Sequence, residues 1–312
     1  MPWRRPLLGA ALVGAGALAV CAVSRPISPP RPLPVTWLPD PPRQGAAVVI
    51  VAGPDTVRNP GRDTVVAVTG TLAGETLRLE RGHDGRFRAL AAIPVSAGGS
   101  IALPLAVVRR ERDTTYQFVR APVGEGSFLS ERLRLPPRFV TPPASLAPQL
   151  AEERRAIRAA LARSARTPRL WDSGFEVPVP GRVTEAFGTR RVINGEAQAR
   201  HLGVDLAGRP GTPVRAANRG VALVAGRFYY QGNAVYLDHG AGLVTSYMHL
   251  SRILVAAGDS VRAGQVIGLV GATGRVTGPH LHWTAYFGKI LFDPMTLRDA
   301  AVQALVVGEG AP

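Results

Sequence analysis

This chain contains very little cysteine and lysine for its 312 residues. The one cysteine, Cys21, excludes an intramolecular disulfide and any cysteine-rich metal site. The one lysine, Lys289, leaves a single candidate for lysine-based covalent chemistry. Charged residues make up only 19% of the chain against 46% hydrophobic residues, and this balance excludes a disordered or fibrous protein.

The charge of the chain is strongly positive, because 37 basic residues, nearly all of them arginine, outnumber 22 acidic residues. The formal net charge of +15 indicates an acidic partner or surface without specifying which one. Nucleic acid is one such partner, but no nucleic-acid motif accompanies the charge, so we expect no nucleic-acid binding. A length of 312 residues suits one large domain or two ordinary domains.

The N-terminal segment has the residue order of an export signal. Arg4 and Arg5 precede an apolar stretch at residues 7–23, and a polar, proline-rich break follows. Residues 1–24 are therefore predicted to be a signal peptide or a membrane anchor, because the apolar stretch is close to the shortest length that spans a bilayer, about 17 residues. Cys21 leaves lipid modification as a third alternative.

The next part of the chain changes from a proline-rich composition to a β pattern. Residues 25–44 predict an extended spacer with little packing of its own. Residues 45–138 predict a β-sandwich-like module, because short apolar or alternating runs, such as 47–51 and 64–68, are separated by Gly, Pro and Asp. Nothing in this module indicates chemistry, and His83 is expected to lie in a turn.

A helical linker and a second β domain follow. Residues 139–172 are predicted to contain a helix at 149–166, a stretch without Gly or Pro in which apolar residues recur at helical spacing. Residues 173–300 predict the larger β domain, and residues 301–312 a tail. The candidate strands of this domain are residues 220–225, 234–237, 243–247, 266–270 and 281–286.

Two pairs of residues in the second domain have the spacing of metal ligands. His201 and Asp205 are four residues apart in a glycine-containing, extended stretch, and alternate positions of a strand share one side. His280 and His282 likewise project to one face of a strand. Two imidazoles and one carboxylate that converge would form a three-ligand set with an open position for water, as a catalytic zinc site requires.

The remaining residues of interest lie between these pairs. His249 ends a candidate strand, and Tyr247 beside it is either a hydrogen-bond donor near the site or a packed residue of the strand. His239 precedes Gly240, so we expect it in a hairpin turn with a structural role.

As a set, the motifs of residues 175–297 resemble those of the lysostaphin-type (LytM-like) zinc endopeptidases, which cut peptidoglycan peptides. The match follows the order of the family, and the preceding β module and helix are similar to those of periplasmic members from Gram-negative bacteria. The motifs are His201-Leu-Gly-Val-Asp205, Tyr247-Met-His249-Leu-Ser251, Gly258-Asp-Ser-Val-Arg-Ala-Gly264-Gln265 and Gly274-Arg-Val-Thr-Gly-Pro-His280-Leu-His282-Trp283.

The resemblance implies a role for each site residue. His201, Asp205 and His282 would bind one Zn²⁺ per chain, and His249 and His280 would be the catalytic pair that does not bind the metal. It further implies a mainly β fold, hydrolysis of peptidoglycan crosslinks during cell-wall remodelling, and a periplasmic location in the cell envelope, free or anchored in the inner membrane. Membrane contact is then expected only through the N-terminal segment.

Several alternatives stay open at this point. A catalytically inactive module of the same fold would bind the wall or activate a partner hydrolase, although no ligand position is missing here. The segment at residues 258–268 also resembles part of lipoyl and biotinyl carrier domains, but Lys289 lies far beyond the turn that such carriers modify. The N-terminal β module would inhibit the site, bind an envelope protein partner or act as a spacer.

Overall fold

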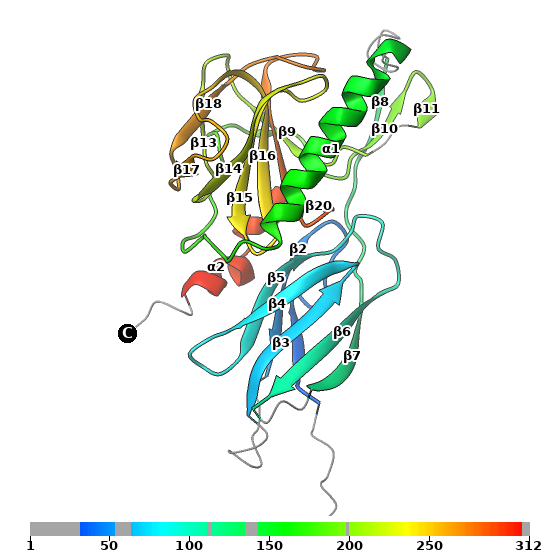
Figure 1. The fold of residues 1–312 in the computed structure, drawn as a ribbon. Helices are drawn as coiled ribbons and strands as arrows, with labels where there is room; N and C mark the ends of the chain where they lie inside the picture. The colour runs from blue at the N-terminus through cyan, green and yellow to red at the C-terminus, as the bar shows by residue number, and fades with distance from the viewer. Residues whose placement is uncertain (1–31, 54–63, 111–113, 135–142, 198–199, 308–312) are drawn as a thin grey trace, which may run out of the picture. The chain divides into compact units, whose positions relative to one another are not determined.

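The computed structural model describes residues 32–53, 64–110, 114–134, 143–197 and 200–307 (Figure 1). The predicted export segment at residues 1–24, with Cys21, lies outside these residues. None of the helices in the described ranges has both the length and the apolar character needed to cross a membrane.

The first part of the chain is a seven-stranded sheet with the order β1-β2-β5-β4-β3-β6-β7. Buried and exposed residues alternate along β6, where Ile101, Leu103 and Leu105 face the core. His83 lies exposed in the turn between β4 and β5, as expected. The strands are β1 (Val35–Leu38), β2 (Ala47–Ala52), β3 (Val65–Leu72), β4 (Glu75–Arg81), β5 (Phe87–Ala92), β6 (Ser100–Arg109) and β7 (Thr114–Pro122).

The proline-rich segment is more ordered than the sequence predicts. Strand β1 pairs antiparallel with β2, and the side chains of Leu33 and Trp37 are buried in the core. The expectation of an unpacked spacer at residues 25–44 is therefore wrong for this strand. The reason is that Trp37 supplies enough apolar surface to bury, while the prolines of the segment lie outside the paired residues.

A short strand and a long helix lead to the second sheet. Strand β8 (Ser130–Leu133) pairs in parallel with β10 (Arg190–Ile193), which pairs in turn with β11 (Glu196–Ala197). After the 3₁₀ turn η2 (Ala144–Leu146), helix α1 (Ala147–Ser164) agrees with the predicted helix. Its buried residues are Leu150, Ala160, Leu161 and Ser164, and the helix contacts β14, β15 and β16.

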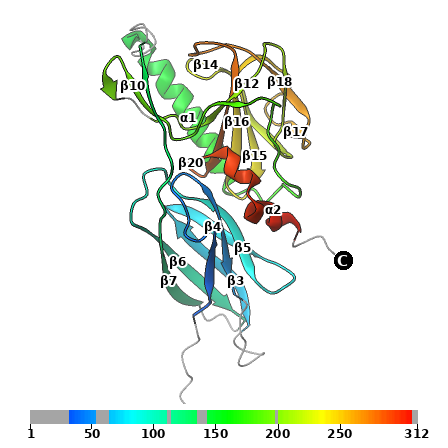
Figure 2. The same cartoon turned by 180° about the vertical axis from the view of Figure 1, so that it is seen from behind.

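The second sheet has ten strands, so the mainly β fold class is confirmed (Figure 2). Its main path runs β17-β14-β15-β16-β19-β12-β9, and each of the five candidate strands falls within an observed one. The strands are β9 (Val183–Glu185), β12 (Val204–Ala207), β13 (Pro213–Arg215), β14 (Gly220–Phe228), β15 (Gly232–Gly240), β16 (Leu243–Ile253), β17 (Ser260–Val261), β18 (Val266–Val270), β19 (His280–Phe287) and β20 (Ile290–Phe292).

The C-terminal segment also differs from the prediction. The 3₁₀ turn η3 (Pro294–Arg298) is followed by helix α2 (Ala300–Val307), which buries Val302 and Leu305. The expected tail from residue 301 is therefore wrong for residues 301–307, because these apolar side chains pack on the core. Residues 308–312 lie outside the described part of the chain.

Candidate metal centre

Two adjacent strands place the candidate ligands opposite each other. In the antiparallel pair of β12 and β19, Asp205 and His282 are register partners. Strand β16 lies on the other side of β19, where Met248 is the partner of His282, so His249 follows directly. The sheet register therefore brings together residues that are up to 77 positions apart in the sequence.

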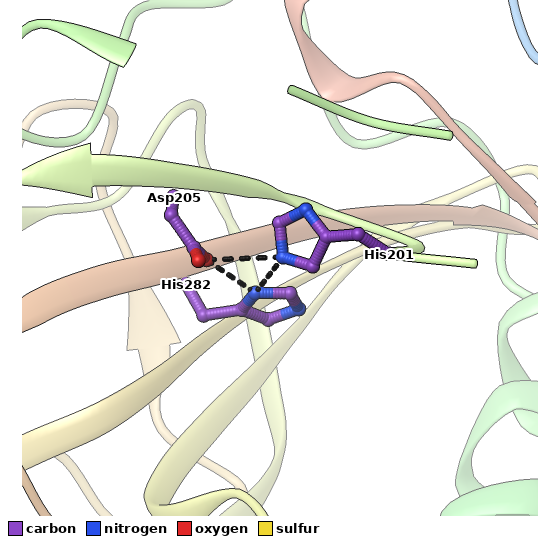
Figure 3. A group of neighbouring side chains, drawn as sticks. All are labelled: His201, Asp205 and His282. Atoms are coloured by element: carbon purple, nitrogen blue, oxygen red, sulfur yellow. Dashed lines mark hydrogen bonds and ion pairs between the residues drawn. The ribbon is translucent and has the colours of Figure 1, made fainter. Parts of the chain in front are cut away.

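Three side-chain atoms converge at this point of the sheet (Figure 3). Asp205 Oδ1 lies 2.7 Å from His282 Nδ1 and 3.2 Å from His201 Nε2. The two imidazole nitrogens are 3.0 Å apart. His201 and Asp205 are buried, and His282 is partly exposed, so the cluster is accessible from one side.

The chemistry of this donor set fits a cation. His201 Nδ1 donates to the carbonyl of Ala186 at 3.1 Å, so in the neutral imidazole Nε2 carries a lone pair. That lone pair is directed at a carboxylate oxygen and at a second imidazole nitrogen. A single proton satisfies only one of these close approaches, whereas one metal ion with two nitrogen ligands and one oxygen ligand satisfies all three.

The electrostatics of the cluster favour the deprotonated ligands. Burial raises the pKa of Asp205, but the contacts with His201 and His282 outweigh it and hold the pKa of this carboxyl well below its usual range. Burial also lowers the pKa of His282, against the opposing effect of Asp205. A carboxylate and a neutral imidazole are the forms that bind a metal.

His249 and His280 lie next to this cluster but are not among its three converging side chains. The ring centroids of His249 and His280 are 5.0 Å apart, and His249 is 5.8 Å from His282. His280 Nε2 lies 3.5 Å from Asp205 Oδ2. The structure thus brings together all five residues that the sequence analysis singled out for the site.

Both of these imidazoles are oriented by main-chain carbonyls. His249 Nδ1 donates to Thr273 O at 2.9 Å, and His280 Nδ1 donates to Gly278 O at 2.8 Å. In the neutral rings each Nε2 then carries the lone pair that a general base needs. Burial, helped by the neighbouring His282, lowers the pKa of His249 to about 3, so its ring is uncharged at neutral pH.

The backbone at His249 is strained. Its φ of 64° lies in the left-handed region, which residues with side chains seldom adopt, although β16 continues on both sides of it. The expectation that His249 ends a strand is therefore wrong, because β16 extends to Ile253. Local strain of this kind clusters at functional sites.

The two other candidates have structural roles. His239 lies in β15 rather than in a hairpin turn, and it is fully buried between Arg219 O and Thr245 Oγ1, each 2.7 Å from a ring nitrogen. Tyr247 OH accepts from Ala217 N at 2.8 Å and lies 2.9 Å from Thr245 Oγ1. The packed interpretation of Tyr247 is thus the one that the contacts support.

Sequence reasoning missed the groups that orient the site. The carbonyls of Ala186, Thr273 and Gly278 accept hydrogen bonds from three of the histidine rings, and the side chains of these residues give no sign of that role. Gly203 offered a signal, because a Cβ there would lie 2.6 Å from the His282 ring. The close approach of His282 therefore requires glycine at this position.

A groove of about 640 Å³ opens beside His280. The loop at residues 277–280 forms one part of its lining, and the segment at residues 207–212 forms another. Arg209 is the one arginine among the described residues that line it. A carboxylate is the group that a guanidinium such as that of Arg209 binds well.

Comparison with known families finds a match to part of the second sheet. Residues 199–294 match the model of peptidase family M23. The matched region contains all five residues of the site.

Curated relatives match a part of this chain. The chain is 40% identical over 126 residues to the peptidoglycan DD-endopeptidase ShyC of Vibrio cholerae, which is 40% of this chain and 29% of that protein. It is 47% identical over 126 residues to the DD-carboxypeptidase/endopeptidase Mpg of Neisseria meningitidis serogroup B, with the same two shares. The chain thus spans less than a third of the length of these relatives.

One solved structure is similar over most of the chain. A crystal structure from Pseudomonas aeruginosa that carries the family name peptidase M23 matches with a TM-score of 0.59 and 26% identity. The match covers 83% of this chain and 96% of the other. The likeness therefore extends beyond the second sheet.

Proposed function

We propose, on the basis of the peptidase family M23 domain that this chain carries at residues 199–294, that it is a zinc-dependent endopeptidase that hydrolyses peptide crosslinks of bacterial peptidoglycan. The family is one of metallopeptidases. Among the relatives, the Vibrio cholerae protein is named a peptidoglycan DD-endopeptidase. A role in cell-wall remodelling, in the cell envelope, follows from this substrate.

One observation carries the proposal. Three candidate ligand atoms converge within 3.2 Å of one another, and two further imidazoles, each held through Nδ1 by a main-chain carbonyl, lie beside them. A purely structural metal site has no use for the second pair. We therefore assign His201, Asp205 and His282 as metal ligands and His249 and His280 as catalytic residues.

The chain's own residues then perform the proton transfers. Zn²⁺ supplies a Lewis acid that polarises the scissile carbonyl and lowers the pKa of a water towards about 7. With the ion bound, Nε2 of His249, of His280 or of each in turn would accept a proton from the attacking water and deliver a proton to the leaving amine, while each Nδ1 keeps its own proton in the hydrogen bond to Thr273 O or Gly278 O.

Mass spectrometry of the products released from purified, crosslinked peptidoglycan tests the proposal. We expect crosslinked fragments to decrease and free stem peptides to increase with the parent protein, and neither change with His249→Ala. The masses of the new termini identify the bond that is cut. Unchanged crosslinks with a zinc-loaded parent would contradict hydrolysis and favour the inactive, wall-binding module.

A further inference from the structure

His201 differs from the other two proposed ligands in its backbone. Asp205 and His282 belong to paired strands, whereas His201 precedes β12 and belongs to no strand. Its position depends instead on the segment at residues 186–189. Gly188 N donates to His201 O at 2.7 Å, His201 N donates to Thr189 O at 2.9 Å, and the ring donates to Ala186 O.

This orienting segment is itself held by a strap, defined here as residues 126–133, which follows β7. Arg190 N donates to Leu129 O at 2.8 Å, and β8 pairs in parallel with β10 from Arg190 onwards (Figure 1). The strap therefore supports the stretch of backbone to which His201 is hydrogen-bonded.

Phe128 is the central contact of the strap. Gly188 lies directly against its ring, and a Cβ at Gly188 would collide with that ring. On the ring face, the Arg200 guanidinium lies 4.7 Å from the centroid, and Arg200 Nη1 donates to Gly188 O at 2.8 Å. Phe128 thus contacts both neighbours of His201: the residue before it in sequence, and the glycine that is hydrogen-bonded to it.

We propose that Phe128 is a positioning residue for the metal ligand His201, acting through Gly188 and Arg200. The inference rests on the metal-binding role of His201 in the proposed function. Strand pairing places Asp205 and His282, so the position of His201 decides how closely the three proposed ligand atoms converge. Without the ring, Gly188 and Arg200 lose this contact, and His201 Nε2 is less firmly held at the position that Asp205 and His282 define.

Zinc affinity of the purified protein, measured by competition with a chromophoric chelator, tests this directly. Replacing a residue that orients a metal ligand without binding the metal typically lowers metal affinity about 10- to 100-fold. We expect Phe128→Ala to weaken zinc binding by about that factor. Phe128→Tyr keeps the ring and should bind zinc like the parent. Leu129→Ala is the matched control, because Leu129 is 66% exposed and the substitution keeps the carbonyl that accepts from Arg190 N.

Two further measurements separate positioning from general destabilisation. We expect the metal-free Phe128→Ala protein to unfold in one cooperative transition like the parent, at a lower temperature, while the visible absorption spectrum of its Co²⁺ form changes because the His201 ligand is displaced. Should Phe128→Ala fail to fold, Arg200→Gln removes the guanidinium from both the ring and Gly188 O and should weaken zinc binding several-fold.

The outcomes are distinct. A parent that binds zinc, together with Phe128→Ala or Arg200→Gln variants that bind it equally tightly, overturns the inference and leaves the proposed function intact. A parent that binds no zinc overturns the proposed metal centre and this inference with it. A parent that binds zinc but cleaves no peptidoglycan contradicts only the proposed activity.

Discussion

Asp205 and His282 are direct partners across β12 and β19, and their Oδ1 and Nδ1 atoms are 2.7 Å apart. Residues opposite each other in an antiparallel pair have Cβ atoms about 5 Å apart, so both side chains reach one point without any change in the backbone. The ladder of the sheet therefore preorganises this pair of proposed ligands, and His201 completes the triangle from outside it.

Replacing His282 should remove the metal centre. We expect His282→Ala to lower zinc affinity by more than about 100-fold, which exceeds the effect of replacing a residue that only orients a ligand, and to abolish peptidoglycan cleavage. Zinc content after dialysis and the cleavage assay report the two effects. His83→Ala is the control, because His83 lies exposed in a turn. Full zinc content in His282→Ala would contradict the ligand assignment.

Replacing His249 should separate binding from turnover. His249→Ala removes a proposed proton acceptor but none of the three ligand atoms, so zinc content should stay at the parental level. General acid–base residues typically contribute 10²- to 10⁴-fold, and we expect kcat to fall by about that factor. Steady-state kinetics on a soluble crosslinked peptide measure it, and a kcat equal to that of the parent would rule out the role.

His239 should make stability depend on pH. Burial lowers its pKa to about 4, below the ordinary value of 6.5, so the unfolded chain binds a proton more readily than the folded one between these values. His239 therefore contributes fully to the free energy of unfolding above pH 6.5. This contribution, up to about 3 kcal/mol, is lost as the pH falls towards 4. Denaturant unfolding of zinc-free protein from pH 7 to 4 measures it.

A variant without the histidine ring is the control for this prediction. His239→Asn lacks the titrating ring, so its free energy of unfolding should fall less steeply between pH 6.5 and 4 than that of the parent. The comparison concerns the slope, because the variant also loses hydrogen bonds to Arg219 and Thr245 and is less stable at every pH. Parallel pH profiles would show that His239 does not titrate in this range.

Arg209 should select acidic peptides in the groove beside His280. We expect Arg209→Gln to lower kcat/KM about tenfold for a peptide with a free carboxylate beside the scissile bond, the lower end of what a charged hydrogen bond contributes. The carboxamide form of the same peptide should be nearly unaffected. Arg215→Gln is the control, since Arg215 is exposed and contacts Gly264 O. Equal losses for both peptides would contradict the assignment.

Secondary structure follows from the sequence where the local pattern and the tertiary environment agree. The strands at residues 266–270 and 281–286 and the helix at 149–166 lie within a residue or two of observed elements. Their apolar side chains recur at the period of the structure that buries them, and neighbouring strands reinforce the same choice.

Predictions from the sequence are wrong where packing against distant segments decides the local structure. Prolines predict a spacer at residues 25–44, but β1 forms because β2 offers it a partner and Trp37 a place in the core. His239 precedes a glycine, as turn residues often do, yet Arg219 and Thr245 enclose it within a strand. Neither partner is visible from the local sequence.

For the site, the types and spacing of residues determined the chemistry: His-x-x-x-Asp and His-x-His motifs in a domain without cysteine favour a three-ligand metal site. Only the tertiary structure decided that β12 and β19 pair in the register that joins Asp205 to His282. It also decided that main-chain carbonyls orient the histidine rings and that the Phe128 ring packs against Gly188, in the segment to which His201 is hydrogen-bonded. These depend on main-chain groups and close packing between distant segments, because a carbonyl is present at every residue and carries no signal in the side-chain sequence.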